Sequence, residues 1–373
     1  MNQRAPLSQL TVLVVPLDWG LGHATRCIPL IKTLTQQQCK VILAGEDKTK
    51  ILLRETFPEL IFLPLEGYRI RYSRAKWSFP FTIAAQVPQI LSTIKKEHHW
   101  LGEIVKKYKV NGIISDNRYG LYHGVLPSVF VTHQLQVKTG LGKSADALLQ
   151  KLNYRLINRF SECWIPDEEK EPGLAGELSH PQKFPAIQLK YTGILSRFRK
   201  KLKPETSGYI LILLSGPEPQ RTIFENMVLS QLNVIRLPVV LVRGLPGNTE
   251  QLKTLNGITS YNYLGAEELQ QKMEGAAIVI SRCGYSTVMD LAALAKKSIL
   301  IPTPGQTEQE YLAHHLMQSK FALCIEQKKF NLRAALDLSE TFDYCLPRFE
   351  NENQLQELVC SFLASIRKQK LLS

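Results

Sequence analysis

The chain has 373 residues, of which 44% are hydrophobic and 21% are charged. This length predicts two domains with cores of their own, and the composition excludes a largely disordered chain. The net charge of +13 favours an anionic partner, whereas seven scattered cysteines without a CxxC pair argue against a disulfide framework or a zinc site. The cysteine pattern therefore favours a reduced, cytoplasmic protein without a bound metal. No stretch has the roughly 18 apolar residues that span a bilayer.

Buried strands alternate with helices along the first half of the chain. The strands are apolar throughout, which is typical of parallel sheets covered on both faces. They are expected at 10–16, 40–45, 60–64, 112–115, 128–133 and 163–166. The intervening helices are expected at about 24–37, 83–108 and 144–160.

A basic stretch with little apolar content, residues 197–208, interrupts this pattern and is interpreted as a linker, although a surface loop within one domain would have a similar composition. The alternation then restarts, with strands expected at 209–216, 238–244, 276–281 and 298–302 and helices at about 219–232, 285–296 and 308–319. We therefore predict an α/β protein of two doubly wound, Rossmann-like domains, with a first domain over 1–196, a linker over 197–208, a second domain over 209–350 and an amphipathic helix within 351–373. That helix is expected to dock on the protein's own surface rather than in a membrane.

Ligands of open α/β sheets bind beyond the carboxyl ends of the strands, and the first strand ends in a glycine turn. Gly20 and Gly22 allow close backbone approach, and the following helix offers free N–H groups. His23 lies in this turn and could act as a base, although a lone histidine is more often a structural hydrogen-bonding group. Because Thr25 stands where a dinucleotide fingerprint has its third glycine, NAD is a poor fit.

Three strand ends of the second half carry further candidates. Ser215 and Gly216 end its first strand, where a plain tight turn is the alternative reading. The turn at 281–287 contains Arg282, Gly284, Tyr285 and Ser286, and its backbone amides could bind a diphosphate. Asp290 lies one helical turn beyond Ser286 and could accept hydrogen bonds from ribose hydroxyls, although a solvated acidic residue is the alternative. Gln306, Glu308 and Gln309 follow the next strand and suit sugar hydroxyls, unless they only cap the loop.

The run 281–315 resembles the donor segment of GT-B glycosyltransferases, in particular the family 28 type that modifies lipid-linked muropeptide. The resemblance implies two Rossmann-like domains facing across a cleft and transfer from a UDP-sugar with inversion, with the UDP-sugar as co-substrate and no separate cofactor. It places Gly284 and Tyr285 near the diphosphate, Asp290 at the ribose, and Gln306, Glu308 and Gln309 near the donor sugar. Gly22 and His23 resemble the first glycine loop of the family, the 132–134 segment a histidine motif at a strand end, and Ser215 and Gly216 the second glycine loop.

The chemistry requires a base for the acceptor hydroxyl and stabilisation of the leaving diphosphate. His23 is our first choice for the base, with Asp116 and His133 as alternatives. The chain has no DxD motif, which favours a metal-independent site in which helix dipoles and amides carry the charge.

Residues 69–81 combine four cationic side chains with aromatic ones. This composition favours an anionic membrane surface or a lipid-linked acceptor, with a basic loop that packs its aromatics inward as the alternative and nucleic acid as an unlikely partner. We therefore expect a cytoplasmic protein peripheral to the inner face of the membrane, with a glycan or lipid-linked acceptor. Competing functions are a non-hydrolysing UDP-sugar epimerase, a catalytically silent nucleotide-sugar-binding protein and, third, an NAD oxidoreductase.

Overall fold

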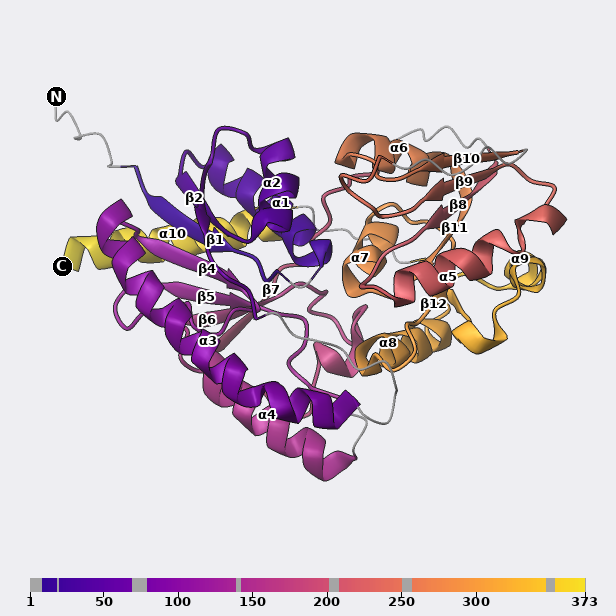
Figure 1. Cartoon of the computed structure of the whole chain (residues 1–373). Coiled ribbons are helices and arrows are strands. Elements are labelled where there is room, and N and C mark those ends of the chain that lie inside the picture. The colour runs from indigo at the N-terminus through magenta and orange to yellow at the C-terminus, as the bar shows by residue number, and fades with distance from the viewer. Residues whose placement is uncertain are drawn as a thin grey trace.

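The computed structural model describes residues 9–18, 20–68, 79–138, 142–200, 208–249, 257–346 and 353–372. Two α/β domains lie beside each other, each built on one parallel sheet (Figure 1). The predicted fold class is therefore confirmed. The basic and aromatic stretch at 69–78 and the central part of the predicted linker, 201–207, lie outside the described residues.

The N-terminal domain contains a seven-stranded sheet with the order β3-β2-β1-β4-β5-β6-β7. Its strands are β1 (Thr11–Val15), β2 (Lys40–Gly45), β3 (Ile61–Pro64), β4 (Gly112–Asp116), β5 (Ser128–Val131), β6 (Glu162–Ile165) and β7 (Gln188–Tyr191). Its helices are α1 (Leu21–Gln36), α2 (Asp47–Thr56), α3 (Phe79–Tyr108) and α4 (Lys143–Ile157). Strands β1, β4, β5 and β6 are buried along their whole length, as their unbroken apolar character predicts.

The C-terminal domain contains a six-stranded sheet with the order β10-β9-β8-β11-β12-β13. Its strands are β8 (Tyr209–Leu213), β9 (Val239–Val242), β10 (Ile258–Tyr261), β11 (Ala276–Arg282), β12 (Ser298–Ile301) and β13 (Leu323–Cys324). Its helices are α5 (Gln220–Leu229), α6 (Ala266–Gly275), α7 (Tyr285–Ala293), α8 (Thr307–Gln318) and α9 (Leu332–Thr341).

The last helix, α10 (Gln354–Leu372), returns to the N-terminal domain and lies along it (Figure 1). The ring of Phe362 meets Trp164 of β6 edge-on, with centroids 5.6 Å apart. Ile366 and Phe362 pack so closely over Gly112 that a side chain there would collide with both. The apolar stripe of this helix therefore covers the protein's own core, as we expected.

Several elements escaped the sequence pattern, namely α2, β7, β10, α6, β13 and α9. The edge strands β7 and β10 are only partly buried and carry polar residues, so they lack the apolar run of a central strand. Three predicted strands extend at least two residues too far: β5 ends at Val131 rather than 133, β8 at Leu213 rather than 216, and β9 at Val242 rather than 244. The shorter strands place His133 and Ser215 in the loops beyond the sheet.

Both sheets have a topological switch point, where the strand order reverses and the following helices diverge to opposite faces. It lies between β1 and β4 in the first sheet and between β8 and β11 in the second. The predicted turns at 20–23, 215–216 and 284–286 follow β1, β8 and β11. The fold therefore brings the predicted ligand-binding turns to the positions where this architecture forms crevices.

Candidate active site between the two domains

The first glycine turn presents the start of α1 to the second domain. Gly20 is the N-cap of α1 with φ of 75°, a backbone conformation that favours glycine. The first turn of α1 has no acidic residue, so the positive end of the helix dipole is not offset there. His23 lies in this turn, and its side chain is 15% exposed.

His23 contacts a buried carboxylate at the end of β4. Its Nδ1 atom lies 3.2 and 3.3 Å from the two carboxylate oxygens of Asp116. Arg26, one helical turn after His23, donates from Nε to one oxygen of Asp116 at 2.8 Å and from Nη2 to the other oxygen. Asp116 is fully buried and Arg26 is 2% exposed, so this ion pair is shielded from water.

His133 extends the cluster into the second domain. Its Nδ1 atom lies 3.1 Å from Nη1 of Arg26, and its Nε2 atom lies 2.8 Å from a carboxylate oxygen of Glu308, the second residue of α8. The side-chain Nε2 atom of Gln134 donates to the other carboxylate oxygen of Glu308 at 3.0 Å. The structure thus joins all three base candidates, His23, Asp116 and His133, in one network that reaches the predicted sugar-binding turn.

The environment divides the charges of this network. Burial alone would raise the pKa of Asp116, but Arg26 and His23 outweigh burial and hold the pKa of this carboxyl well below its usual range. Burial lowers the pKa of His23, and Arg26 lowers it further against the opposing effect of Asp116. At neutral pH the cluster therefore holds an ionised Asp116 beside a neutral His23.

The N-terminus of α7 faces this cluster from the second domain. Gly284 is its N-cap, and the first turn of α7 contains no acidic residue. The ring of Tyr285 stacks on His133 with centroids 4.1 Å apart, and its hydroxyl donates to the carbonyl of Pro166 at 2.7 Å. The hydroxyl of Ser286 donates to the carbonyl of Gly22 at 3.0 Å. The starts of α1 and α7 therefore meet across the domain boundary.

Asp290 lies one turn further along α7, against the chain that leaves the first domain. Its carboxylate accepts a hydrogen bond from Ser196 at 2.6 Å and lies 4.0 Å from Nε of Arg197. Burial raises the pKa of Asp290 to about 6, against the opposing effects of Arg197 and Ser196. The Arg197 Nε atom is itself buried without a hydrogen-bond partner. This acid is therefore buried and incompletely compensated, unlike a solvated surface residue.

In the turn at the start of α8, the two glutamines hold the loop, whereas Glu308 contacts the first domain. The side-chain oxygen of Gln309 accepts from the amide of Thr303 at 2.9 Å, and its NH2 group donates to Gln306. Both glutamines therefore hold the loop itself in this arrangement, which is the capping alternative that the sequence left open. Glu308 points across the boundary to His133 and Gln134.

Arg282, a predicted donor residue, points toward α5 instead of toward α7. Its guanidinium lies over the ring of Phe224 at 4.4 Å, and NH2 donates to the carbonyl of Gln220 at 2.8 Å. Its Nε and NH1 atoms are buried without a partner, and burial lowers its pKa to about 10. The Ser215–Gly216 loop follows β8 beside it, with Gly216 at φ 102°.

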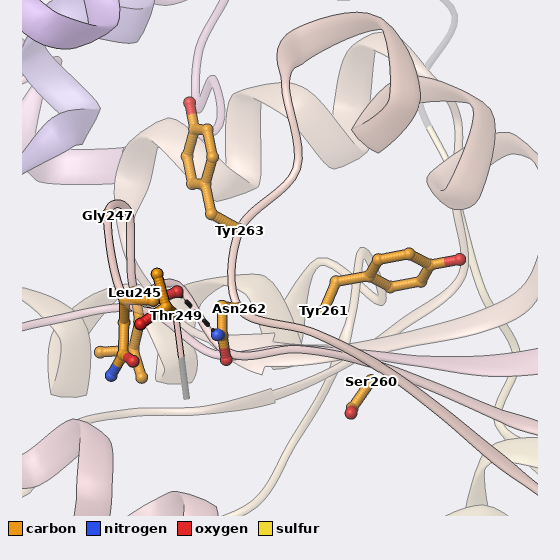
Figure 2. Close-up of a pocket in the computed structure, with 8 residues that line it drawn as sticks. Leu245, Gly247, Thr249, Ser260, Tyr261, Asn262 and Tyr263 are labelled. Atoms are coloured by element: carbon orange, nitrogen blue, oxygen red, sulfur yellow. Dashed lines mark hydrogen bonds between the residues drawn. The ribbon is translucent and has the colours of Figure 1, made fainter. Parts of the chain in front are cut away.

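A cavity of about 490 Å³ opens at the carboxyl ends of β9 and β10 (Figure 2). Its lining is uncharged: Leu245, Gly247, Asn248, Thr249, Ser260, Tyr261, Asn262 and Tyr263. Asn262 turns toward the 245–249 loop and donates to the carbonyl of Asn248 at 2.8 Å, while Tyr263 points away from it. The Tyr263 hydroxyl lies 3.3 Å from Glu55 of α2, so this cavity also adjoins the domain boundary.

Sequence reasoning missed three residues of this region, Arg26, Ser196 and Arg197. Arg26 could have been suspected, because positions i and i+3 share one face of a helix and His23 was already a candidate. Ser196 and Arg197 fall at the predicted linker boundary, where polar composition hid their contact with Asp290. Within the described ranges, no group of three or more His, Cys, Asp or Glu side chains is arranged to hold a metal ion.

Comparison with solved structures defines the fold. The structure of the glycosyltransferase of kitacinnamycin aligns over 97% of this chain and 96% of its own chain, with a TM-score of 0.63 and 13% sequence identity. The MurG structure of Acinetobacter baumannii covers 97% and 99%, with a TM-score of 0.51 and 15% identity. These similarities establish the GT-B fold for the whole chain.

The sequence of the second domain is similar to one family of glycosyltransferases. Residues 222–357 match the glycosyltransferase family 28 C-terminal domain. A relative from Clostridium perfringens, a UDP-N-acetylglucosamine--N-acetylmuramyl-(pentapeptide) pyrophosphoryl-undecaprenol N-acetylglucosamine transferase, is 27% identical over 175 residues, which are 44% of this chain and 47% of the relative. The match thus spans about half the length of that relative. The chain therefore has the GT-B fold, and its second domain is similar to the glycosyltransferase family 28 C-terminal domain, as the motif at 281–315 predicted.

Proposed function

We propose that this protein transfers a hexosyl group from a UDP-sugar to a hydroxyl of a lipid-linked or cell-envelope glycan, with inversion and without a metal ion. One observation carries the proposal: the His23–Asp116 pair, at 3.2 Å, lies beside the point where the starts of α1 and α7 meet. A base and an anion-binding helix end therefore face the same space, which is what displacement of a diphosphate by a hydroxyl requires.

The Nε2 atom of His23 is the general base. When His23 carries its proton on Nδ1 and donates it to Asp116 in place of accepting from Arg26, the lone pair of Nε2 is free to take the proton of the acceptor hydroxyl. The acceptor oxygen then forms a bond to the anomeric carbon, and the bond from that carbon to the UDP oxygen breaks, with its electron pair leaving on UDP. Attack from the face opposite the leaving group gives inversion. Asp116 is too acidic, through its pair with Arg26, to serve as the base itself.

The start of α7 binds and stabilises the leaving diphosphate. The amides of Tyr285 and Ser286 begin this helix after Gly284, and its first turn carries no acidic side chain that would repel an anion. The Ser286 hydroxyl, now bound to the Gly22 carbonyl, becomes a further donor when a phosphate oxygen replaces that carbonyl. These donors, together with a sequence that lacks the DxD motif, support the metal-independent form of the reaction.

The nucleoside binds on the far side of α7. Asp290 accepts from ribose hydroxyls, and a sugar hydroxyl can take the place that Ser196 now occupies. Arg197, with its unpartnered Nε atom, lies beside it. We assign the nucleobase of UDP to the uncharged cavity at the ends of β9 and β10, whose side-chain amides and tyrosines suit a neutral heterocycle. The donor sugar then lies toward Glu308 and the glutamines of the α8 turn.

The acceptor side is the N-terminal domain. Exposed apolar side chains lie one turn apart on two helices, Val87 and Leu91 on α3 and Leu148 and Leu152 on α4. These helices run beside each other away from the second domain (Figure 1). Lys143, Lys151 and Arg155 are exposed on α4 as well. Apolar groups among cations suit the surface of an anionic bilayer, which supports a lipid-linked acceptor and a peripheral position on the membrane. None of the helices in the described ranges is long and apolar enough to cross a membrane.

The test is a panel of UDP-hexoses and UDP-N-acetylhexosamines, offered with a polyprenyl diphosphate-linked sugar or with water, while UDP release is measured. NAD serves as a control for nucleotide binding. We expect one donor to release UDP in the presence of the lipid-linked acceptor. His23→Gln should lower kcat by about 100-fold or more while UDP still binds. Conversion of the donor sugar without UDP release would identify an epimerase instead, and absence of UDP binding would overturn the proposal.

A further inference from the structure

The side chain of Tyr285 anchors the start of α7 to the first domain. It is 3% exposed, its ring stacks on His133 with centroids 4.1 Å apart and planes 9° from parallel, and its hydroxyl donates to the carbonyl of Pro166 at 2.7 Å. His133 and Pro166 lie beyond the ends of β5 and β6. One side chain therefore ties the turn proposed to bind the diphosphate to two neighbouring strand ends across the domain boundary.

The chemistry of this anchor favours a closed contact. Burial, and after it the carboxylate of Asp167, raise the pKa of the Tyr285 hydroxyl well above its usual 10, so the hydroxyl remains a hydrogen-bond donor at neutral pH. Its bond to Pro166 is shielded from water, and the ring stacking adds a contact of defined geometry to the burial of the ring. The start of α7 is therefore stable in its position against the first domain.

Groups that are proposed to bind the donor already have protein partners in this anchored arrangement. The hydroxyl of Ser286 donates to the carbonyl of Gly22, and the carboxylate of Asp290 accepts from Ser196. Both bonds run from α7 to the first domain or to the chain that leaves it. A donor molecule must therefore replace contacts that help to hold the two domains together.

We propose that Tyr285 is a positioning residue that keeps the start of α7 against the first domain when no donor is bound, so that its side-chain contacts open before UDP or a UDP-sugar enters or leaves. The inference rests on the proposed donor site. It concerns the rates of nucleotide binding and release, whereas the proposed function concerns the transfer itself. The side chain acts through the turn whose backbone amides face the diphosphate.

This role has a specific kinetic consequence. The Tyr285 contacts exist in the unliganded protein and form again when the turn closes on bound nucleotide, but they are absent in the open state between the two. Weakening them should therefore raise the association and dissociation rate constants of UDP together and leave the dissociation constant almost unchanged. A side chain that only stabilised the fold, or that bound UDP directly, would lower the affinity without faster association.

The test measures UDP binding and release by stopped flow in the full-length protein. In Tyr285→Leu, which loses the ring contact and the hydroxyl, we expect both rate constants to rise about ten-fold while the dissociation constant changes less than about three-fold. Tyr285→Phe keeps the ring on His133 and loses only the hydroxyl, so both rate constants should rise by less. Tyr311→Phe is the matched control: its hydroxyl also contacts the first domain, at the amide of Glu177, but it lies on α8 and is solvent-exposed. Its UDP rate constants should stay within about two-fold of the wild type.

A second readout does not depend on nucleotide. Cys345 in the second domain and Cys360 on α10, which packs on the first, are exposed and can carry a pair of dyes once the partly buried Cys324 is replaced by serine. Energy transfer in ligand-free Tyr285→Leu should report a wider distribution of dye distances than in the wild type. Equal UDP rate constants, or equal distance distributions, in the wild type and folded Tyr285→Leu would overturn the role of Tyr285 while the proposed function stands. Absence of UDP binding in both proteins would overturn the proposed function and this role together.

Discussion

The hydroxyl of Ser286 in the second domain donates a hydrogen bond to the carbonyl of Gly22 in the first, with an oxygen–oxygen distance of 3.0 Å. The two residues lie 264 positions apart in the sequence. The bond joins the first turns of α1 and α7 and marks how closely the domains approach where the diphosphate is proposed to bind. A group added at this contact should hold the domains apart.

Gly22→Ala tests this contact directly. A Cβ atom at position 22 would lie 2.7 Å from the Ser286 hydroxyl, closer than such atoms tolerate. We expect kcat/KM to fall about ten-fold, a loss of about 1.4 kcal/mol, and the radius of gyration in solution to increase. Gly102→Ala is the matched control, because no atom lies within 4 Å of a Cβ there and alanine favours a helix. Equal effects of the two variants would contradict the role assigned to the contact.

The pH dependence of turnover should follow His23. Because burial and Arg26 lower the pKa of His23 from its usual 6.5, the base stays unprotonated, and the enzyme active, to a pH below 6.5. The same shift acts on folding: the stability from burying neutral His23 is present above pH 6.5 and decreases as pH falls toward the lowered pKa. The kcat profile and urea unfolding at several pH values measure both effects. An acidic limb above pH 6.5 would rule out His23 in this environment as the base.

Asp290→Asn should stabilise the unliganded protein while weakening nucleotide binding. Burial raises the pKa of Asp290 from 3.8 to about 6, so the folded state binds this proton more tightly than the unfolded chain. Stability is therefore lost as pH rises from about 4 to 6 and stays reduced at pH 7. Asparagine removes this cost and can still accept from Ser196. We expect a gain of about 1–3 kcal/mol in unfolding free energy at pH 7 and a UDP affinity at least ten-fold weaker. Unchanged UDP affinity would refute the ribose assignment.

Glu308 couples the two domains, so its replacement should act together with that of Gln134. In Glu308→Gln the oxygen can still accept from His133, but the new NH2 group faces the NH2 of Gln134, which now donates at 3.0 Å. We expect kcat/KM to fall about ten-fold, in line with about 1–2 kcal/mol for a disrupted buried contact. A double-mutant cycle with Gln134→Leu should show a coupling of about 1 kcal/mol. Additive effects would show that the contact makes no contribution.

Membrane association should depend on the exposed face of α4. Leu148 is 62% and Leu152 is 48% exposed, and we expect the double Leu→Ser variant to bind anionic phospholipid vesicles at least ten-fold more weakly, because up to about 1.5–3 kcal/mol of apolar transfer per side chain is lost. UDP release with a water-soluble acceptor should not change. Leu338→Ser on α9 is the control, since this side chain is 55% exposed on the other domain. Equal vesicle binding by all three proteins would remove the support for a membrane-facing acceptor site.

The central elements of both domains could be predicted because their physical signals are local. Apolar runs such as 10–16 and 40–45 need no partner to be recognised, and a glycine turn after each run marks the carboxyl edge where α/β sheets bind ligands. Edge strands β7 and β10 could not be predicted in this way, because half-exposed strands carry mixed residues. Strand ends were also overestimated, since an apolar residue continues a pattern whether or not a neighbouring strand remains to pair with it.

The sequence by itself determined the fold class, the donor motif and a set of candidates that included His23, Asp116 and His133. Only the tertiary structure showed that these candidates form one network, because its contacts join residues about a hundred positions apart, as Arg26 does with Asp116 and His133. Burial likewise decided that Asp290 is an incompletely compensated acid and that Arg282 turns toward α5. Side-chain chemistry can be read along a chain, but the proton on each ring and the charge on each acid depend on neighbours that folding alone brings together.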